Sequence, residues 1–154
     1  MILEGLGRFE EAEASYRKAL LLNPDDCGVY YNLGNAMREL KKFEEAAAAY
    51  QQAILVKSDY AEAHSNLGVA LQELGRSEEA ETSCRQAVAI TPDFADAHYN
   101  LGNALKDLGR PREAEASYRQ AIALKPDNAE PHNSLAFTLR ELGRLEESEA
   151  SYRQ

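Results

Sequence analysis

Basic residues are scarce in this sequence. Its 17 Lys and Arg residues stand against 26 Asp and Glu residues, which gives a formal net charge of −9. Nucleic acids and anionic membrane surfaces are bound by dense faces of Lys and Arg, so this charge argues against both as partners. It favours neutral or basic protein partners instead.

Cysteines and long apolar segments are scarce as well. Cys27 and Cys84 have neither metal-binding nor redox spacing, and a disulfide between them is the less favoured alternative. A reducing cytoplasm is therefore the expected location. The aliphatic run at residues 19–22 is far too short to span a bilayer, and residues 1–10 lack the apolar core of a signal peptide. We expect neither a membrane span nor a targeting segment.

What the sequence contains is an internal repeat. Residues 61–94 and 95–128 align without a gap and are identical at about 21 of 34 positions. The same frame extends to residues 27–60 and to the incomplete units 1–26 and 129–154. We therefore expect a single array of three full repeats flanked by two partial ones.

Each repeat has the pattern of two helices. In residues 61–94, Ala63, Leu67 and Leu71 share one helical face, and Gly75 ends that helix in a left-handed C-cap. A second helix is expected from about residue 78 until Pro92 stops it. The same cap position is held by Gly7, Gly109 and Gly143, and once by Lys41.

Acidic and small residues recur at fixed places in the repeat. Asp59, Asp93 and Asp127 are expected to cap the next first helix in the manner of a capping box. Small residues mark where the two helices of a repeat approach closely: Gly34, Gly68, Gly102 and Ala136, facing Ala12, Ala46, Ala80, Ala114 and Ser148. Bulk beside them comes from Tyr16, Tyr50, Tyr118 and Tyr152, with Cys84 as the exception. Ion pairs on exposed faces are predicted for Glu13–Arg17, Glu81–Arg85, Glu115–Arg119 and Glu149–Arg153.

Over its whole length the chain resembles the tetratricopeptide repeat family. In one repeat the matching residues are Leu67, Gly68, Leu71, Ala80, Ala87 and Pro92. The resemblance implies an all-α fold, a right-handed superhelical solenoid of antiparallel helix hairpins. It also implies a protein-interaction scaffold that binds extended or helical peptide segments on a concave face formed by the first helix of each repeat.

Asparagines repeat on that expected face. Asn32, Asn66 and Asn100 hold the same place in successive repeats, and Ser134 holds it in the next. A carboxamide can donate to and accept from one peptide unit, so the row is suited to binding peptide backbone. It resembles the asparagine-lined groove in the repeat region of O-linked N-acetylglucosamine transferases. The alternative is that these asparagines bond a neighbouring helix and fix the stacking.

Other polar and aromatic residues are expected to share the peptide-binding face. They are Tyr31, Tyr99, Asn35, Asn103, Arg38, Lys106 and Arg140, beside Glu39, Glu73, Asp107 and Glu141. The family's two-carboxylate clamp is not expected, because Tyr31, Asp96 and Asn100 stand where that clamp needs cations.

No catalytic, cofactor-binding or metal-binding residue is expected. His64, His98 and His132 lie one repeat apart, which is too far for one ion, so they are interpreted as packing residues. No phosphate-binding loop, nucleophile elbow or metal motif is present in the sequence. The protein is therefore expected not to be an enzyme.

Two alternatives to the peptide-binding scaffold concern the ends of the array. The first is that the chain is part of a larger protein, such as the substrate arm of a glycosyltransferase. The second is self-association: residues 1–6 are expected to be only a stub of a first helix, and Leu145, Ala150 and Tyr152 to lack a covering helix. Concentration-dependent oligomers would follow from the second.

Overall fold

The computed structural model describes residues 2–152, and the side chains of residues 7–148. Every regular element in that part of the chain is an α-helix. The order is α1 (Ile2–Leu22), α2 (Cys27–Glu39), α3 (Phe43–Val56), α4 (Ala61–Glu73), α5 (Ser77–Ile90), α6 (Ala95–Asp107), α7 (Pro111–Leu124), α8 (Ala129–Glu141) and α9 (Leu145–Tyr152). No helix in the described residues is both long and apolar enough to cross a membrane.

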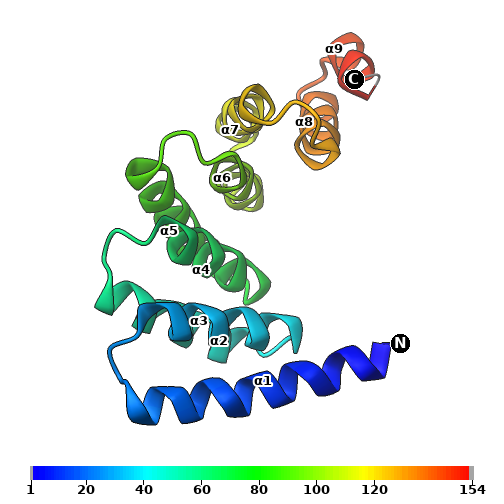
Figure 1. The fold of residues 1–154 in the computed structure, drawn as a ribbon. Helices are drawn as coiled ribbons and strands as arrows, with labels where there is room; N and C mark the ends of the chain where they lie inside the picture. The colour runs from blue at the N-terminus through cyan, green and yellow to red at the C-terminus, as the bar shows by residue number, and fades with distance from the viewer. Residues whose placement is uncertain (1, 153–154) are drawn as a thin grey trace.

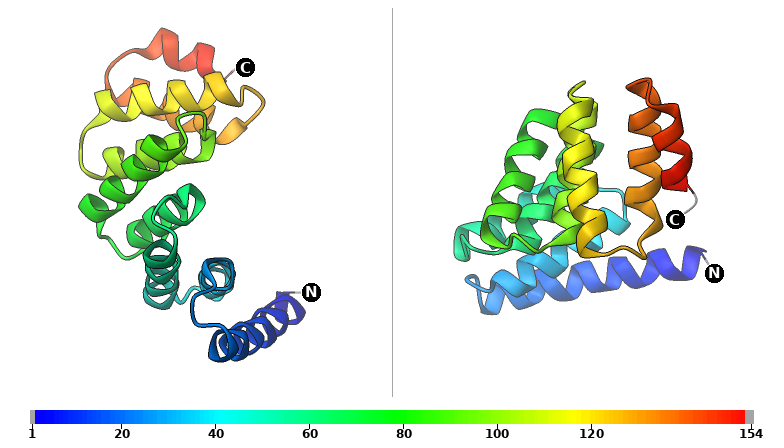
Figure 2. Two further views of the ribbon diagram at one scale, coloured as in Figure 1. Left: turned by 60° about the vertical axis from the view of Figure 1, so that its left-hand side comes forward. Right: turned by 90° about the horizontal axis from the view of Figure 1, so that it is seen from above.

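The helices stack in an arc (Figure 1). The pairs α2–α3, α4–α5, α6–α7 and α8–α9 pack as hairpins, and each hairpin packs on the next through α3–α4, α5–α6 and α7–α8. The helix axes turn along the stack, so that α1 is seen from the side while α8 is seen nearly end-on. The left view of Figure 2 shows α1 and α9 at opposite ends of this stack. The expected all-α superhelical solenoid is confirmed.

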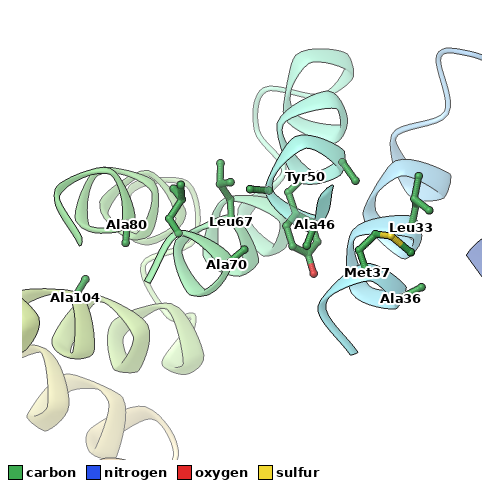
Figure 3. Packing of buried hydrophobic residues seen from close by; sticks show 12 residues of the cluster. Leu33, Ala36, Met37, Ala46, Tyr50, Leu67, Ala70, Ala80 and Ala104 are labelled. Carbon is green, nitrogen blue, oxygen red and sulfur yellow. The ribbon is translucent and has the colours of Figure 1, made fainter. Parts of the chain in front are cut away.

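Two apolar clusters join the hairpins. Leu33 and Met37 of α2, Tyr50 of α3 and Leu67 of α4 belong to one cluster, which extends to Ala104 of α6 (Figure 3). Full burial of each such large side chain stabilises the fold by about 1.5–3 kcal/mol. A second cluster, centred on Leu105, Tyr118 and Leu139, continues the core toward α8.

Glycine permits the close approach within each hairpin. A Cβ atom at Gly34 would lie 2.5 Å from the ring of Tyr50, and one at Gly102 would lie 2.5 Å from the ring of Tyr118. Cβ atoms essentially never come within 3.0 Å of a neighbouring heavy atom, and both rings are fully buried. The expected pairing of small residues with bulky ones is confirmed in these two hairpins.

Left-handed residues end the first helices, as expected. Gly75, Gly109 and Gly143 have φ of 72°, 69° and 76°. Lys41 takes the same conformation, with φ of 57°, although a side chain makes it unfavourable. The prediction for Gly7 is wrong, because Gly7 lies inside the continuous helix α1. The expected stub at residues 1–6 is wrong for the same reason: a short separate turn is costly to nucleate, whereas residues added to an existing helix each gain a hydrogen bond.

The expected caps at Asp59, Asp93 and Asp127 are also wrong. In each case the N-cap is the residue after the aspartate. Tyr60 caps α4 and Phe94 caps α6, and neither side chain makes a capping hydrogen bond. Asn128 caps α8, and its Oδ1 accepts from Glu130 N at 3.1 Å. The aspartates therefore precede the position from which a carboxylate reaches the first free N–H groups. A carboxylate does cap α2, where Asp26 is itself the N-cap and accepts from Val29 N at 3.0 Å.

Candidate peptide-binding face

The helices α2, α4, α6 and α8 form what we call the inner face, and α4 and α6 lie on the inner side of the arc (Figure 1). Asn66 on α4 donates from Nδ2 to the Tyr31 hydroxyl at 3.2 Å and to Asn35 Oδ1 at 3.0 Å, both on α2. Asn35 Oδ1 also accepts from the Tyr50 hydroxyl at 2.8 Å. Three helices are thus joined by one network, which contains three of the residues expected at the site.

A similar arrangement occurs around α6. Asn100 donates from Nδ2 to Ser65 Oγ on α4 at 3.0 Å. Asn103 Oδ1 accepts from the Tyr118 hydroxyl at 2.8 Å, and the ring of Tyr99 lies 6.0 Å from that of Tyr118. Burial raises the pKa of Tyr118, because the ionised phenolate loses its hydration.

Part of the hydrogen-bonding capacity of the asparagine row is left over. In the part of the chain whose side chains are described, Oδ1 of Asn66 and Oδ1 of Asn100 accept no hydrogen bond. Asn32 is exposed, and its carboxamide makes no hydrogen bond to those residues. The donors of Asn66 and Asn100 therefore fix the stacking, as the alternative interpretation held, while their carbonyl oxygens stay available.

Aromatic rings flank this row. Tyr31 is half-buried, with its ring 5.1 Å from that of Tyr60 and 6.0 Å from that of Tyr50. A further ring on this face, Phe137 of α8, was not predicted from the sequence. Lys106 Nζ lies 4.4 Å from the centre of that ring, and the guanidinium carbon of Arg140 lies 5.1 Å from it. Phe137 could have been found, because it holds the repeat position of Asn35 and Asn103.

The charges on the inner face are unevenly paired. Arg38 forms an ion pair with Glu39 at 3.3 Å, and Asp107 accepts from Gln72 Nε2 at 2.6 Å. Among the described side chains, Lys106 and Arg140 have no carboxylate within ion-pair distance. At the α8 end of the inner face, Lys106 and Arg140 thus contact the ring of Phe137 and, among the described side chains, form no ion pair.

The middle repeat differs from its neighbours at three linked positions. Ser65, Val69 and Cys84 stand where the next repeat has Tyr99, Asn103 and Tyr118. Ser65 and Cys84 are buried, and α4 packs directly on α6. Burial raises the pKa of the Cys84 thiol to about 12, so the group is protonated and chemically inert at neutral pH.

The three histidines contact the loop before their own helix. Nε2 of His64, His98 and His132 lies 3.1, 2.8 and 2.8 Å from the carbonyl oxygens of Ser58, Pro92 and Pro126, respectively. Each contact spans six residues and fixes the entry of the chain into the first helix, which confirms the packing interpretation. No cluster of three metal-binding side chains occurs among the described residues.

Ion pairs join the second helices along the outer side. Glu81 pairs with Arg85 at 2.8 Å, as expected, and also with Arg110 of the next repeat at 2.6 Å. Glu13 makes the same double contact, with Arg17 of its own helix and with Lys42 of the next repeat. Glu115 likewise pairs with Arg119 and with Arg144. The three predicted pairs are therefore formed, with the arginines 49–57% exposed, whereas their carboxylates are only 13–18% exposed because each also contacts the next repeat. The predicted pair Glu149–Arg153 lies outside the described residues.

Solved structures with the same fold have low sequence identity to this chain. MamA from Desulfovibrio magneticus RS-1 has a TM-score of 0.87 at 20% identity, over 96% of this chain and 83% of that one. The protein TTC0263 from Thermus thermophilus has a TM-score of 0.78 at 28% identity, over 98% and 83%. The first repeat domain of Spaghetti (RPAP3), bound to the HSP90 peptide SRMEEVD, has a TM-score of 0.74 at 26% identity, over 76% and 93%.

Family models account for almost the entire chain. A TPR repeat model matches residues 5–40, 34–75 and 73–109, and two tetratricopeptide repeat models match residues 95–128 and 117–150. No curated protein matches the sequence significantly. Members of the matched family typically mediate protein–protein interactions. The repeats, the helix hairpins and these matches together establish that the chain belongs to the tetratricopeptide repeat family.

Proposed function

We propose that the protein binds peptide segments of partner proteins along its inner face and acts as a scaffold, not as an enzyme. The observation that carries the proposal is the pair of asparagines, Asn66 and Asn100, whose amide groups are anchored while their carbonyl oxygens accept no hydrogen bond from the described residues. An anchored carboxamide loses little further entropy when a peptide N–H donates to it. Asn32 adds a third, exposed amide in the same row.

The remaining predicted residues complete this binding face. Tyr31 and Tyr99 would contact the side chains of the ligand, and Asn35 and Asn103 would hold the tyrosine and asparagine groups in position. Arg38 and Lys106 would select ligand charge at the two ends of the face. The resemblance to the asparagine-lined groove of O-linked N-acetylglucosamine transferases belongs to this proposal as a binding mode, without a transferase activity.

The proposed affinity is modest. Each net hydrogen bond contributes about 0.5–1.5 kcal/mol, and ordering the peptide opposes binding. Three asparagines alone would then give Kd values on the order of micromolar to millimolar. The net charge of −9 favours a neutral or basic segment and disfavours nucleic acid.

The absence of catalysis and the cytoplasmic location are also proposals. The protonated Cys84 thiol and the loop-bound histidines are poorly suited to nucleophilic or acid–base chemistry. Cys27 and Cys84 both carry free thiols, which suits a reducing compartment.

A second candidate function is self-association through α9. Leu145, at the start of α9, is 60% exposed, a large apolar surface for one residue. Contact with a second copy of the chain would cover it. Sedimentation velocity over a wide concentration range tests this candidate, which requires a rise in mass with concentration that Leu145→Glu abolishes.

The main proposal is tested with a peptide array probed in parallel by wild type and by the triple variant Asn32→Ala, Asn66→Ala and Asn100→Ala. Gln120→Ala, which removes an exposed carboxamide from the outer helix α7, is the matched control. We expect spots bound by wild type and control to be lost with the triple variant, whose helicity is retained. Equal binding by the triple variant would mean that the asparagines only fix the stacking, and would contradict the proposal.

A further inference from the structure

One repeat position on the inner face carries long cationic or amide side chains. It is held by Arg38 on α2, Gln72 on α4, Lys106 on α6 and Arg140 on α8. Arg38 forms an ion pair with Glu39, and Gln72 donates to Asp107 on the next first helix. The first two members of this row are therefore already bound to carboxylates of the chain.

Lys106 does not repeat this contact. By the pattern of Gln72 and Asp107 its partner would be Glu141, which holds the position of Asp107 on α8. Its Nζ lies instead 4.4 Å from the centre of the Phe137 ring, and no described carboxylate lies within ion-pair distance. This contact lies inside the array, with α4 before α6 and α8 after it, so Lys106 keeps its charge although a first helix follows on each side.

The aromatic ring is specific to this part of the inner face. Asn35, Val69 and Asn103 hold the position of Phe137 in the preceding repeats. The guanidinium carbon of Arg140 lies 5.1 Å from the centre of the same ring. The ring thus holds two cations in place, so that little side-chain entropy is lost when an anion binds to them. An anion would also relieve the repulsion between the two like charges.

The donor groups suit a carboxylate. An ammonium group has three donors, and a guanidinium group offers a flat fork that binds a carboxylate through two parallel hydrogen bonds. Lys106 is half-buried and Arg140 is exposed, so both are reached from solvent. Tyr99 and Asn103 precede Lys106 on the same face of α6, at i, i+4 and i+7, so a peptide on the asparagine row passes these cations.

We propose that Lys106 and Arg140, positioned by the ring of Phe137, bind the carboxylate of an Asp or Glu side chain in the peptide ligand. The inference rests on the proposed peptide-binding function and adds that the ligand, neutral or basic as a whole, carries an acidic residue where it passes α6 and α8. The site differs from the family's two-carboxylate clamp, whose cation positions are held here by Tyr31, Asp96 and Asn100.

The probe is an array of peptides with an acetylated N-terminus and an amidated C-terminus, which leaves side chains as the source of any carboxylate. Each sequence is printed in versions with Glu, Gln or Lys at one position. Among sequences that wild type binds, we expect one position at which the Glu version binds about threefold or more tighter than the Gln version, and the Lys version more weakly. High salt should reduce this preference by screening the charges.

Variants of the protein locate the site. Lys106→Gln with Arg140→Gln should abolish the preference and retain binding of the Gln version, whereas Lys106→Glu with Arg140→Glu should reverse it in favour of the Lys version. Phe137→Leu keeps an apolar side chain, releases the two cations and should reduce the preference by a smaller factor. Arg38→Gln is the matched control, because Arg38 holds the same repeat position but is paired with Glu39, and it should leave the preference at that position unchanged.

Two results would overturn this inference alone: equal binding of the Glu and Gln versions by wild type, or a preference for Glu that persists without both cations. In either case, loss of binding in the triple variant Asn32→Ala, Asn66→Ala and Asn100→Ala would show that the peptide-binding function itself holds. No binding of any version by wild type would overturn both proposals.

Discussion

Gly102 and Tyr118 set the spacing between α6 and α7. The ring of Tyr118 lies against the glycine, is fully buried and donates its hydroxyl to Asn103. The ring therefore cannot move aside without breaking a hydrogen bond and leaving an apolar gap. The same contact between a glycine and a buried tyrosine occurs at Gly34 and Tyr50, so glycine sets the helix spacing in both hairpins.

Gly102→Ala should lower the free energy of unfolding by about 1–3 kcal/mol, because the added methyl group overpacks this contact. Gly7→Ala is the matched control, since a Cβ atom at that helical glycine has no neighbour within 4 Å. The control should raise stability by about 0.5–1 kcal/mol through the lower entropy of the unfolded chain. Urea denaturation followed by circular dichroism measures both, and a neutral Gly102→Ala would show that the interface is loosely packed.

Lys41 stores strain that its repeat equivalents avoid. Lys41→Gly should raise stability by about 1 kcal/mol, because glycine adopts the left-handed conformation without a steric cost. Gly109→Ala should have the opposite sign, since it introduces a side chain at a φ of 69°. Thermal unfolding measures the melting temperature of both variants. A shift in the same direction for both would contradict the left-handed strain assigned to a side chain at these C-cap positions.

At the level of the helices, ion pairs connect α1, α5 and α7 to the start of the next second helix. Glu13 accepts hydrogen bonds from Lys42 and Arg17, and these lower the pKa of its carboxyl group below 4.5. A lowered pKa in the folded state means that the contribution to stability is present above the unfolded pKa. That contribution is lost as the pH falls through the folded pKa.

Glu13→Gln should therefore destabilise the protein at pH 7, on the order of 1 kcal/mol, and by progressively less as the pH falls below about 4. Glu10→Gln, at an exposed position on the same helix, is the control and should have little effect at any pH. Denaturation midpoints measured from pH 3 to pH 7 would show the convergence. A difference between wild type and Glu13→Gln that stays constant with pH would exclude this ion pair as its cause.

Sequence patterns predicted most of the helices but not their exact ends. The spacing of Leu67 and Leu71 and the left-handed Gly75 are local signals, so they place α4 correctly. The continuity of α1 through Gly7 was not predictable from the repeat frame, because glycines end a helix at the equivalent positions Gly75, Gly109 and Gly143. The N-caps at Tyr60 and Phe94 lack a side-chain signal altogether.

For the molecule as a whole, the composition of the inner face was predictable and its contacts were not. Repeat position alone brings Asn32, Asn66 and Asn100 into one row. That Asn66 bonds Tyr31 and Asn35 depends on the rotation between neighbouring hairpins, which no single repeat encodes. The cation–aromatic cluster at Phe137 likewise requires α6 and α8 to be placed together.

We propose that peptides bind on the first helices of the repeats. The most direct measurement is a titration of ¹⁵N-labelled protein with a peptide selected on the array, followed by amide chemical shifts. We expect the shifts to change along α4 and α6 and at the side-chain amides of Asn66 and Asn100. Changes confined to the outer helices α3, α5 and α7 would contradict the claim.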